Sequence, residues 1–344
     1  MRGNDLIQLK VQQFCAEIAQ DRSWVQAAGG NVSWKTETEL WIKASGTWLA
    51  DAQKKSIFVP VDRASLDDAL ARGDYSFTPR ALDGHTLRPS IETMLHALMP
   101  QQIVVHLHLV DAVARLVRQE CDAEIASALG DDFAWSLVGY HKPGADLARA
   151  IQAQMVLNPK IQVVLLKNHG VIVAADTVED VCKLLSELSK RFELTPRNID
   201  TKPALPLVSS QVSHLSASGY EPCKDECLND LVLDPHLYQR LKDSWSICPD
   251  HVVFLGAAAV CLDDLDDLPR CLQTLEPETP FIFIKGQGIL QILGVTPAKL
   301  AQLMFYLDVI LRQSVEHPMV CLRPEEVSSL LNWDAEKYRQ LLNR

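Results

Sequence analysis

The sequence predicts an α/β protein with two domains. Short apolar runs rich in β-branched residues, such as IVVHLHLV at 103–110, alternate with stretches of helical apolar spacing. At 344 residues the chain is long for one domain. From residue 195 to 222 the composition shifts to Pro, Ser and Thr without clear periodicity, which is typical of a linker. We therefore predict a first domain at residues 1–200, a linker at 201–222 and a smaller α/β domain at 223–344.

The first domain begins with a helix and a pair of turns around a strand. Apolar residues at helical spacing predict a helix over residues 6–18, and alternation predicts a strand at 40–43. Glycine-containing turns, AAGGN before this strand and ASG after it, expose backbone amides. In RPSIETMLHALM, Ser90 is a possible helix cap and Glu92 would stand in the first helical turn.

Two buried strand regions follow. The run at 103–110 is short and β-branched, as a buried strand is, and a helix is expected at 111–118. IQVVLLKNHGVIVAA predicts a strand, a turn at Gly170 and a returning strand. TVEDVCKLLSELSKRF then has a threonine cap, an acidic first turn and a leucine stripe, which predict a helix.

The second domain partly repeats the layout of the first. Residues 280–312 repeat the order strand, Lys-x-x-Gly turn, strand and Thr-capped helix seen at 161–192, with Gln287 in the place of His169. CPDHVVFLGAAAV (248–260) could likewise parallel the strand at 99–113, with apolar residues in the histidine positions. The second domain would then be a degenerate repeat without metal ligands and have a structural or assembly role.

Composition and charge narrow the classes of partner. The net charge of −11 disfavours nucleic acid and anionic membranes, because phosphate groups favour clustered Lys and Arg. The longest uncharged apolar run, Val252–Leu262, is about half of the ~20 residues that span a bilayer. The N-terminal residues MRGNDLIQLK lack the apolar segment of a secretory signal. Nine scattered cysteines, of which only Cys223 and Cys227 are close in sequence, suggest free thiols and a cytoplasmic location.

Three histidines and one glutamate suggest a metal site. On a strand, residues i and i+2 share a face, so His106 and His108 can bind one cation, and His169 could supply a third nitrogen. Glu92 could then act as a general base or acid. Each feature also has a structural interpretation: His-x-His as a packed pair, and Glu92 as a first-turn carboxylate. His96, four residues after Glu92, could orient it or be a packed histidine.

The ordered set GGNVS, KASG, PSIE, HLH and NHG, followed by a Thr-capped helix, resembles the class II aldolase and adducin family. The similarity covers residues 5–195 and is greatest to long bacterial sugar-phosphate aldolases, including the aldolase half of rhamnulose-phosphate aldolase–dehydrogenase fusions. It implies a three-layer fold with a central, mostly antiparallel sheet flanked by helices, and a homotetramer. It also implies the site residues: zinc ligands His106, His108 and His169 (Zn²⁺ or another divalent metal), catalytic Glu92 and Tyr140, and phosphate-binding Gly30, Asn31, Ser45, Gly46 and Ser90.

One position departs from the family pattern. Fuculose-phosphate-type aldolases have two serines before the glutamate, whereas here the second is Ile91. An isoleucine cannot donate to a phosphate, so either Arg88 or another donor replaces it, or the substrate is not phosphorylated as expected. Tyr140 in GYHKPG could equally be a tyrosine that caps a loop.

The activity implied by the resemblance is a zinc-dependent class II aldolase. It would cleave a ketose phosphate or related sugar by retro-aldol chemistry through a metal-stabilised enediolate, which Glu92 protonates on carbon while Tyr140 serves the aldehyde side. The same site could instead support an epimerase, dehydratase or decarboxylase of a sugar phosphate or sugar acid. A non-catalytic scaffold like adducin is disfavoured because all three histidines and Glu92 are present. A nucleotide-binding enzyme is disfavoured because Gln291 follows KGQG where the third fingerprint glycine would stand.

Overall fold

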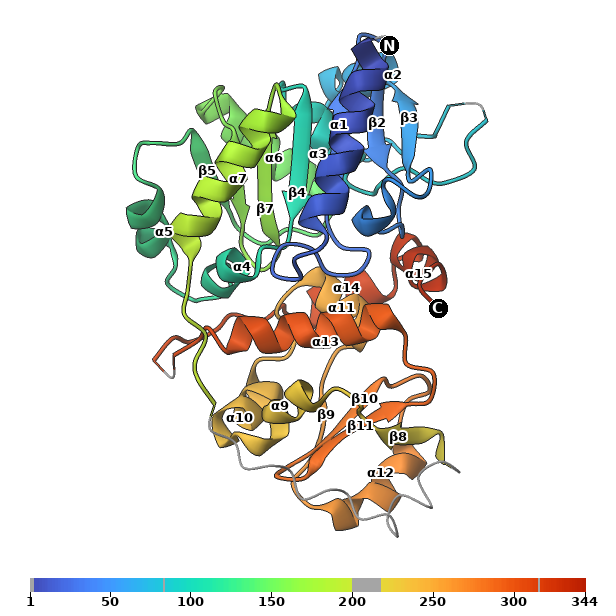
Figure 1. Ribbon diagram of the computed structural model, residues 1–344, viewed down its shortest axis with the longest axis vertical. Coiled ribbons are helices and arrows are strands. Elements are labelled where there is room, and N and C mark those ends of the chain that lie inside the picture. Colours follow the sequence, from blue (N-terminus) through green and yellow to red (C-terminus); the bar gives the residue numbers. More distant parts are fainter. Residues whose placement is uncertain (1–2, 83, 200–217, 315) are drawn as a thin grey trace. The chain divides into compact units, whose positions relative to one another are not determined.

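The computed structural model describes residues 3–82, 84–199, 218–314 and 316–344, which form two compact units (Figure 1). Unit 1 comprises Met1–Glu193 and Trp333–Asn343, and unit 2 comprises Leu194–Asn332 with Arg344. The predicted second domain, 223–344, includes the last helix, whereas in the structure this helix belongs to unit 1. Of the predicted linker 201–222, residues 201–217 lie outside the described part of the chain.

Unit 1 is built on a seven-stranded sheet in the order β3-β2-β1-β4-β7-β6-β5. Every neighbouring pair is antiparallel except β5 and β6, which are parallel. The predicted mostly antiparallel sheet is therefore confirmed. The strands are β1 Asn31–Lys35, β2 Glu39–Lys43, β3 Phe58–Asp62, β4 Ile103–Leu107, β5 Trp135–Val138, β6 Val163–Leu166 and β7 Gly170–Ala175.

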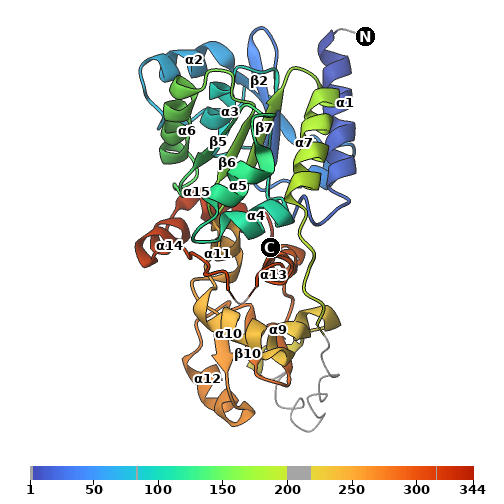
Figure 2. The same ribbon diagram turned by 90° about the vertical axis from the view of Figure 1, so that its left-hand side faces the viewer.

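Helices cover both faces of this sheet and make three layers. One hydrophobic core joins the sheet to α1, α4, α5 and α7, and a second core joins its other face to α2, α3 and α6. Figure 2 shows the sheet between α1 and α7 on one side and α2 and α6 on the other. The helices are α1 Gly3–Ile18, η1 Leu49–Asp51, α2 Arg63–Ala71, α3 Thr93–Leu98, α4 Val110–Leu116, α5 Asp122–Leu129, α6 Ala145–Leu157, α7 Val178–Phe192 and α15 Asp334–Leu341.

Local signals set most element ends in unit 1, with one shift that matters for the site. Thr177 caps α7, since its hydroxyl accepts the backbone N–H of Asp180 at 3.1 Å, as predicted. The helix after Ser90 begins later than expected, at Thr93, because the Thr93 N–H donates to the Ser90 carbonyl in a preceding turn. Glu92 therefore stands at the cap position rather than within the first helical turn.

Unit 2 contains a four-stranded sheet in the order β8-β11-β10-β9 and several short helices. The predicted hairpin and its Thr296-capped helix are confirmed. The segment 248–260 is not the predicted strand. Its residues 249–255 form α11, with a proline in the first turn and Gly256 at φ 93° after the last residue. The elements are β8 Tyr220–Pro222, η3 Glu226–Asn229, α9 Asp230–Leu233, α10 Pro235–Asp243, α11 Pro249–Leu255, β9 Val260–Leu262, η4 Leu265–Asp267, α12 Leu268–Thr274, β10 Phe281–Ile284, β11 Gly288–Ile292, α13 Pro297–Ile310 and α14 Pro324–Leu331.

The sheet of unit 2 has the topology of half the sheet of unit 1. The order β8-β11-β10-β9 matches β4-β7-β6-β5, and in each case only the last pair is parallel. Pro222 pairs with the residue two after Gly288, as His106 pairs with the residue two after Gly170. The counterpart of β4 is therefore β8, and the position of the first histidine is taken by a proline. Among the described residues, no helix is long and apolar enough to cross a membrane.

Candidate metal centre

Two neighbouring strands of the unit 1 sheet, β4 and β7, bring the predicted metal ligands together where β4 ends and β7 begins. Strand β4 ends at Leu107, and its partner β7 starts at Gly170, directly after His169. One ligand nitrogen from each of His106, His108 and His169 lies within 4.8 Å of the others, and all three side chains are buried. The pairing of antiparallel neighbours thus places residues from distant parts of the sequence around one point.

The turn that carries His169 is tight for two different reasons. The residue with left-handed backbone conformation is Asn168, at φ 55°, two positions before Gly170, at which the sequence predicted the turn. Gly170 is required by close packing instead, since a Cβ there would lie 2.4 Å from the carbonyl oxygen of Leu107 and 2.9 Å from the ring of His108. The absence of a side chain at Gly170 lets β7 approach the end of β4, and this approach groups the imidazoles.

The orientation of the imidazoles suits a divalent metal. Nδ1 of His106 lies 3.0 Å from the carbonyl oxygen of Val171, which can only accept, so Nδ1 carries the proton and Nε2 presents its lone pair to the cluster. Nε2 of His108 lies 3.2 Å from that Nε2. Two nitrogens bound to one tetrahedral zinc at about 2.0–2.1 Å would be separated by about 3.3 Å. The residues present therefore fit a three-nitrogen metal site.

Glu92 lies beside this cluster. Its carboxylate oxygens are 3.6 Å from Nε2 of His106 and 3.7 Å from Nε2 of His169, and only 4% of the residue is exposed. A buried carboxylate at this distance can exchange a proton with a substrate held at the three histidines. The structure thus brings Glu92 to the predicted ligands.

A chain of hydrogen bonds through Asn31, His96 and Ser33 holds the carboxylate of Glu92 in place. Nδ2 of Asn31 donates to Oε2 of Glu92 at 2.7 Å, so Oδ1 of Asn31 faces the other way, where it contacts Nε2 of His96. Because Oδ1 only accepts, Nε2 of His96 carries the proton, and Nδ1 accepts from the hydroxyl of Ser33 at 2.7 Å. Burial holds the pKa of His96 well below its ordinary value, so this imidazole is neutral.

His96 is linked to Glu92 through Asn31 rather than by a direct contact along the helix. Of the two interpretations that the sequence left open, a residue that orients Glu92 or a packed histidine, the structure shows a buried ring within a hydrogen-bonded chain that reaches Glu92. No sequence signal identified Ser33, whose hydroxyl contacts His96 of α3. The predicted phosphate contact of Asn31 stays a prediction, and its side-chain amide already bonds to Glu92 and His96.

The other predicted anion-binding residues lie on adjacent loops. Ala44 bridges to Pro89, and the N–H of Ser45 donates to the carbonyl of Arg88 at 2.9 Å, so the loops with Ser45 and Ser90 run side by side. Gly46 has φ 78° and Gly30 has φ 67°. At Gly30, a Cβ would lie 2.9 Å from the carbonyl oxygen of His106, so this glycine allows the first turn to pack on β4.

Lys43 is a residue of this region that sequence reasoning did not single out. Its buried ammonium donates to the carbonyl oxygens of Ala28 at 3.1 Å and Thr47 at 2.6 Å. It thereby ties together the turns before β1 and after β2, which carry Gly30 and Gly46. The sequence signal for Lys43 was its place at the start of the KASG motif, directly before a glycine-containing turn whose carbonyl groups need a donor.

Tyr140 lies in the loop between β5 and α6. Strand β5 ends at Val138, which pairs with Leu166 at the end of β6, so this loop leaves the sheet at the same edge as His169. Its role as a catalytic residue stays a prediction.

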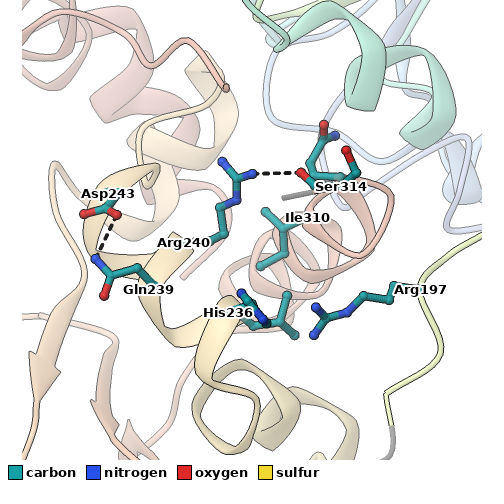
Figure 3. Close-up of a pocket in the computed structure, with 9 residues that line it drawn as sticks. Arg197, His236, Gln239, Arg240, Asp243, Ile310 and Ser314 are labelled. Carbon is teal, nitrogen blue, oxygen red and sulfur yellow. Dashed lines mark hydrogen bonds between the residues drawn. The ribbon is translucent and has the colours of Figure 1, made fainter. Parts of the chain in front are cut away.

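A cavity of about 200 Å³ lies in unit 2, and Figure 3 shows it. Its two arginines are engaged by neighbours: Arg197 pairs with Asp234, and Arg240 donates to the carbonyl oxygens of Ser314 at 3.0 Å and His317 at 3.1 Å. These cations serve contacts within unit 2, so the metal centre of unit 1 is the better candidate site. The cavity is lined by Arg197, His236, Leu237, Gln239, Arg240, Asp243, Ile310, Gln313 and Ser314.

Comparison with known proteins shows the family of the first part of the chain. The profile of the Class II Aldolase and Adducin N-terminal domain matches residues 10–195, more than half of the chain. The chain therefore belongs to the class II aldolase and adducin family.

Individual relatives match the same part of the chain. The chain is 31% identical over 182 residues to an "uncharacterized oxidoreductase YuxG" of Bacillus subtilis (strain 168), a match that covers 47% of this chain but only 25% of that protein. Similar solved structures include the N-terminal class II aldolase domain of a conserved protein from Thermoplasma acidophilum, at 24% identity and a TM-score of 0.43 over 53% of this chain and 90% of that chain. A sugar-phosphate aldolase from Thermotoga maritima is 15% identical, with a TM-score of 0.43 over 55% of this chain and 94% of that chain.

Proposed function

We propose that this protein is a zinc-dependent aldolase that cleaves a C–C bond of a ketose phosphate or related sugar by a retro-aldol reaction. The observation that carries the proposal is the buried carboxylate of Glu92, 3.6 Å and 3.7 Å from two of three clustered imidazoles. The family supports lyase chemistry, and the three histidines together with Glu92 supply what a metal-assisted lyase needs.

Each residue of the site has a distinct task in this proposal. A divalent metal held by His106, His108 and His169 supplies Lewis-acid stabilisation of the negative charge that develops on substrate oxygen. Glu92 moves a proton at the reacting carbon, and Asn31 holds its Oε2 in place. Tyr140 serves the aldehyde oxygen, and the loops with Gly30, Ser45, Gly46 and Ser90 bind the anionic end of the sugar.

The test is a substrate screen on the purified full chain with measured metal content. A panel of ketose 1-phosphates and sugar acids is incubated with and without zinc, and aldehyde release is followed. We expect zinc-dependent cleavage of at least one ketose. Glu92→Gln should retain zinc and lose about 10²–10⁴-fold in kcat, because the amide has the size of the carboxylate but cannot exchange a proton with the substrate. His108→Ala should lose both zinc and activity, and an active, metal-free His108→Ala protein would overturn the proposal.

The same screen identifies the alternatives. A stereoisomer formed without cleavage would indicate an epimerase, loss of water a dehydratase, and release of CO₂ a decarboxylase, and each of these outcomes would reject the aldolase. A protein that binds no metal would indicate a scaffold like adducin.

Homo-oligomerisation and a cytoplasmic location stay predictions from the sequence. Light scattering of the full chain at assay concentration measures the first, since a mass four times that of the chain is expected for the tetramer.

A further inference from the structure

The last helix, α15, contacts the loops that carry the predicted anion-binding residues. It belongs to unit 1, although unit 2 separates it in sequence from the rest of that unit. Its flanking residues Trp333, Leu342 and Asn343 extend the contact surface. Three loops meet it, at residues 46–48, 88–91 and 142–144.

The first loop is fixed to α15 through Asn343 and Leu342. Nε1 of Trp48 donates to Oδ1 of Asn343 at 2.6 Å, and Nδ2 of Asn343 donates to the carbonyl oxygen of Gly46 at 3.2 Å. A Cβ on Gly46 would lie 2.7 Å from Cδ1 of Leu342. The helix thus rests directly on the predicted anion loop and fixes its conformation.

The second loop places a cation near the first. The guanidinium carbon of Arg88 lies 4.1 Å from the centroid of the Tyr338 ring. Tyr338 precedes Leu342 by four residues, so the two side chains share one face of α15, with Cβ atoms about 5–6 Å apart. The guanidinium of Arg88 is therefore held about one helical turn from Gly46, and the backbone of Arg88 also bonds to Ser45.

The third loop contacts Trp333 and also lies close to Ile91, the position that departs from the family pattern. The Lys142 ammonium lies 4.5 Å from the centroid of the Trp333 ring. A Cβ on Gly144 would lie 3.4 Å from that ring and 3.6 Å from the carbonyl oxygen of Ile91. Trp333 and the backbone of Ile91, where a second serine is missing, thus both lie close to Gly144.

We propose that α15 completes the substrate site, and that Tyr338 is a positioning residue that holds Arg88 to bind the oxyanion end of the substrate. This inference rests on the proposed function, because it concerns the anionic end of the same sugar. An aromatic face holds a guanidinium without neutralising its charge and leaves the N–H groups at its edge directed outward. Arg88 then supplies the hydrogen-bond donors to the oxyanion that an isoleucine at position 91 cannot supply. The oxyanion is a phosphate or a carboxylate, and Arg88 can form paired hydrogen bonds with either.

The test measures anion binding to the zinc-loaded full chain by calorimetry, with inorganic phosphate and acetate as probes. Arg88→Met should weaken binding of the preferred probe about tenfold or more, since it removes charge-assisted hydrogen bonds. Tyr338→Ala should weaken it about three- to fivefold, whereas Tyr338→Phe, which keeps the ring face, should stay within about twofold of wild type. In the Arg88→Met background, Tyr338→Ala should have no further effect. Leu341→Ala, on the outer side of the helix at 57% exposure, is the control.

Several outcomes would overturn the inference. These are a wild-type chain that binds neither probe, an unchanged affinity in Tyr338→Ala, or an effect of Tyr338→Ala that persists without Arg88. Zinc content and the thermal midpoint of each variant show that the fold is intact, and Tyr338→Leu replaces Tyr338→Ala if the latter unfolds. If anion binding depends on Arg88 and Tyr338 but no sugar reacts, the proposed function is wrong and the role of α15 stands. If a sugar is cleaved with an unchanged KM in Tyr338→Ala, the role of α15 is wrong and the proposed function stands.

Discussion

At the scale of single residues, the proton chemistry of the site depends on the direction in which each hydrogen bond is made. Glu92 accepts from Asn31, Asn31 accepts from His96, and His96 accepts from Ser33, so the donor and acceptor of every link are fixed. Nδ1 of His96 accepts the hydrogen bond from Ser33 only while the ring is neutral, because a protonated ring would donate at both nitrogens. Burial supplies this condition by lowering the pKa of His96.

Replacing His96 tests whether this chain positions Glu92. His96→Leu leaves Oδ1 of Asn31 without its donor, and we expect kcat to fall about 10–100-fold with zinc content and KM little changed, as for other outer-shell residues of metal sites. His96→Gln retains a donor and an acceptor and should recover most of kcat. Steady-state kinetics on zinc-quantified protein separate the two. Equal activity of the leucine and glutamine variants would show that the histidine is only a packing residue.

Sequence reasoning predicted the three histidines that the structure brings together, and of the residues linked to Glu92 it considered His96 but not Ser33. The spacing of His106 and His108 on a strand, and the glycine turn after His169, are local signals of chemistry. The hydrogen-bonded chain joins two elements, β1 and α3, through side chains that are ordinary in isolation. Ser33 is indistinguishable in sequence from any polar residue on a strand, and its contact depends on β1 lying against α3, which carries His96.

At the scale of elements, the metal centre depends on how closely β7 approaches the end of β4. A Cβ on Gly170 would meet the Leu107 backbone and the imidazoles of His106 and His108, so there is no room for a side chain at this position. The backbone oxygen of Leu107 cannot move without shifting β4, because β4 is paired on both sides.

Gly170→Ala should therefore dismantle the metal site. The added Cβ would lie 2.4 Å from the Leu107 oxygen and 3.2 Å from Cε1 of His106, so the strands must separate and the imidazoles diverge. We expect zinc stoichiometry well below that of wild type and a loss of about 1–3 kcal/mol in unfolding free energy, as for other overpacked sites. Gly139→Ala, where no atom lies within 4 Å of the added Cβ, is the matched control. Full zinc binding by Gly170→Ala would contradict this account of the strand approach.

The elements of both units were predictable where capping and periodicity agreed. Thr177 and Thr296 each mark the start of a helix, and the hairpins before them follow from short apolar runs around a turn. Residues 249–255 were misassigned because a short apolar run has no period that separates a buried helix from a buried strand. Pro249 at the first helical position and Gly256 at the end were the signals that could have identified α11.

At the scale of the whole molecule, the two units share the topology of four strands, but unit 2 has other residues at two of the histidine positions. Strands β8-β11-β10-β9 repeat β4-β7-β6-β5, yet Pro222 and Gln287 stand where unit 1 has His106 and His169. The sequence showed the repeat of hairpin and helix because those signals are local. It could not show that α15 belongs to unit 1, since only tertiary contacts assign a helix to a core.

The stability of unit 2 should depend on pH through His251. This ring is fully buried and packs edge-on against Trp245 and at a tilt against Tyr306, with ring centroids 4.3 Å and 4.8 Å away. Neither ring nitrogen has a hydrogen-bond partner among the described residues. Burial lowers the pKa of His251 from 6.5 to about 3. Between pH 6.5 and 3 the unfolded chain binds a proton that the folded chain does not, so the unfolding free energy falls as the pH falls. The loss is on the order of 4 kcal/mol across that range.

Replacing His251 by phenylalanine isolates this contribution, because the ring packing is retained while the titrating group is removed. Denaturant unfolding, followed by tryptophan fluorescence at pH 7, 5.5 and 4, should give a steeper loss of stability for wild type than for His251→Phe, by up to one proton per molecule. The variant should also be more stable at pH 7, since no unpaired ring nitrogens remain in the core. His236→Phe, at an exposed position of the same unit, should keep the wild-type slope. Identical slopes for wild type and His251→Phe would mean that His251 takes up its proton as readily in the folded chain as in the unfolded one, and that its burial does not control the acid stability of unit 2.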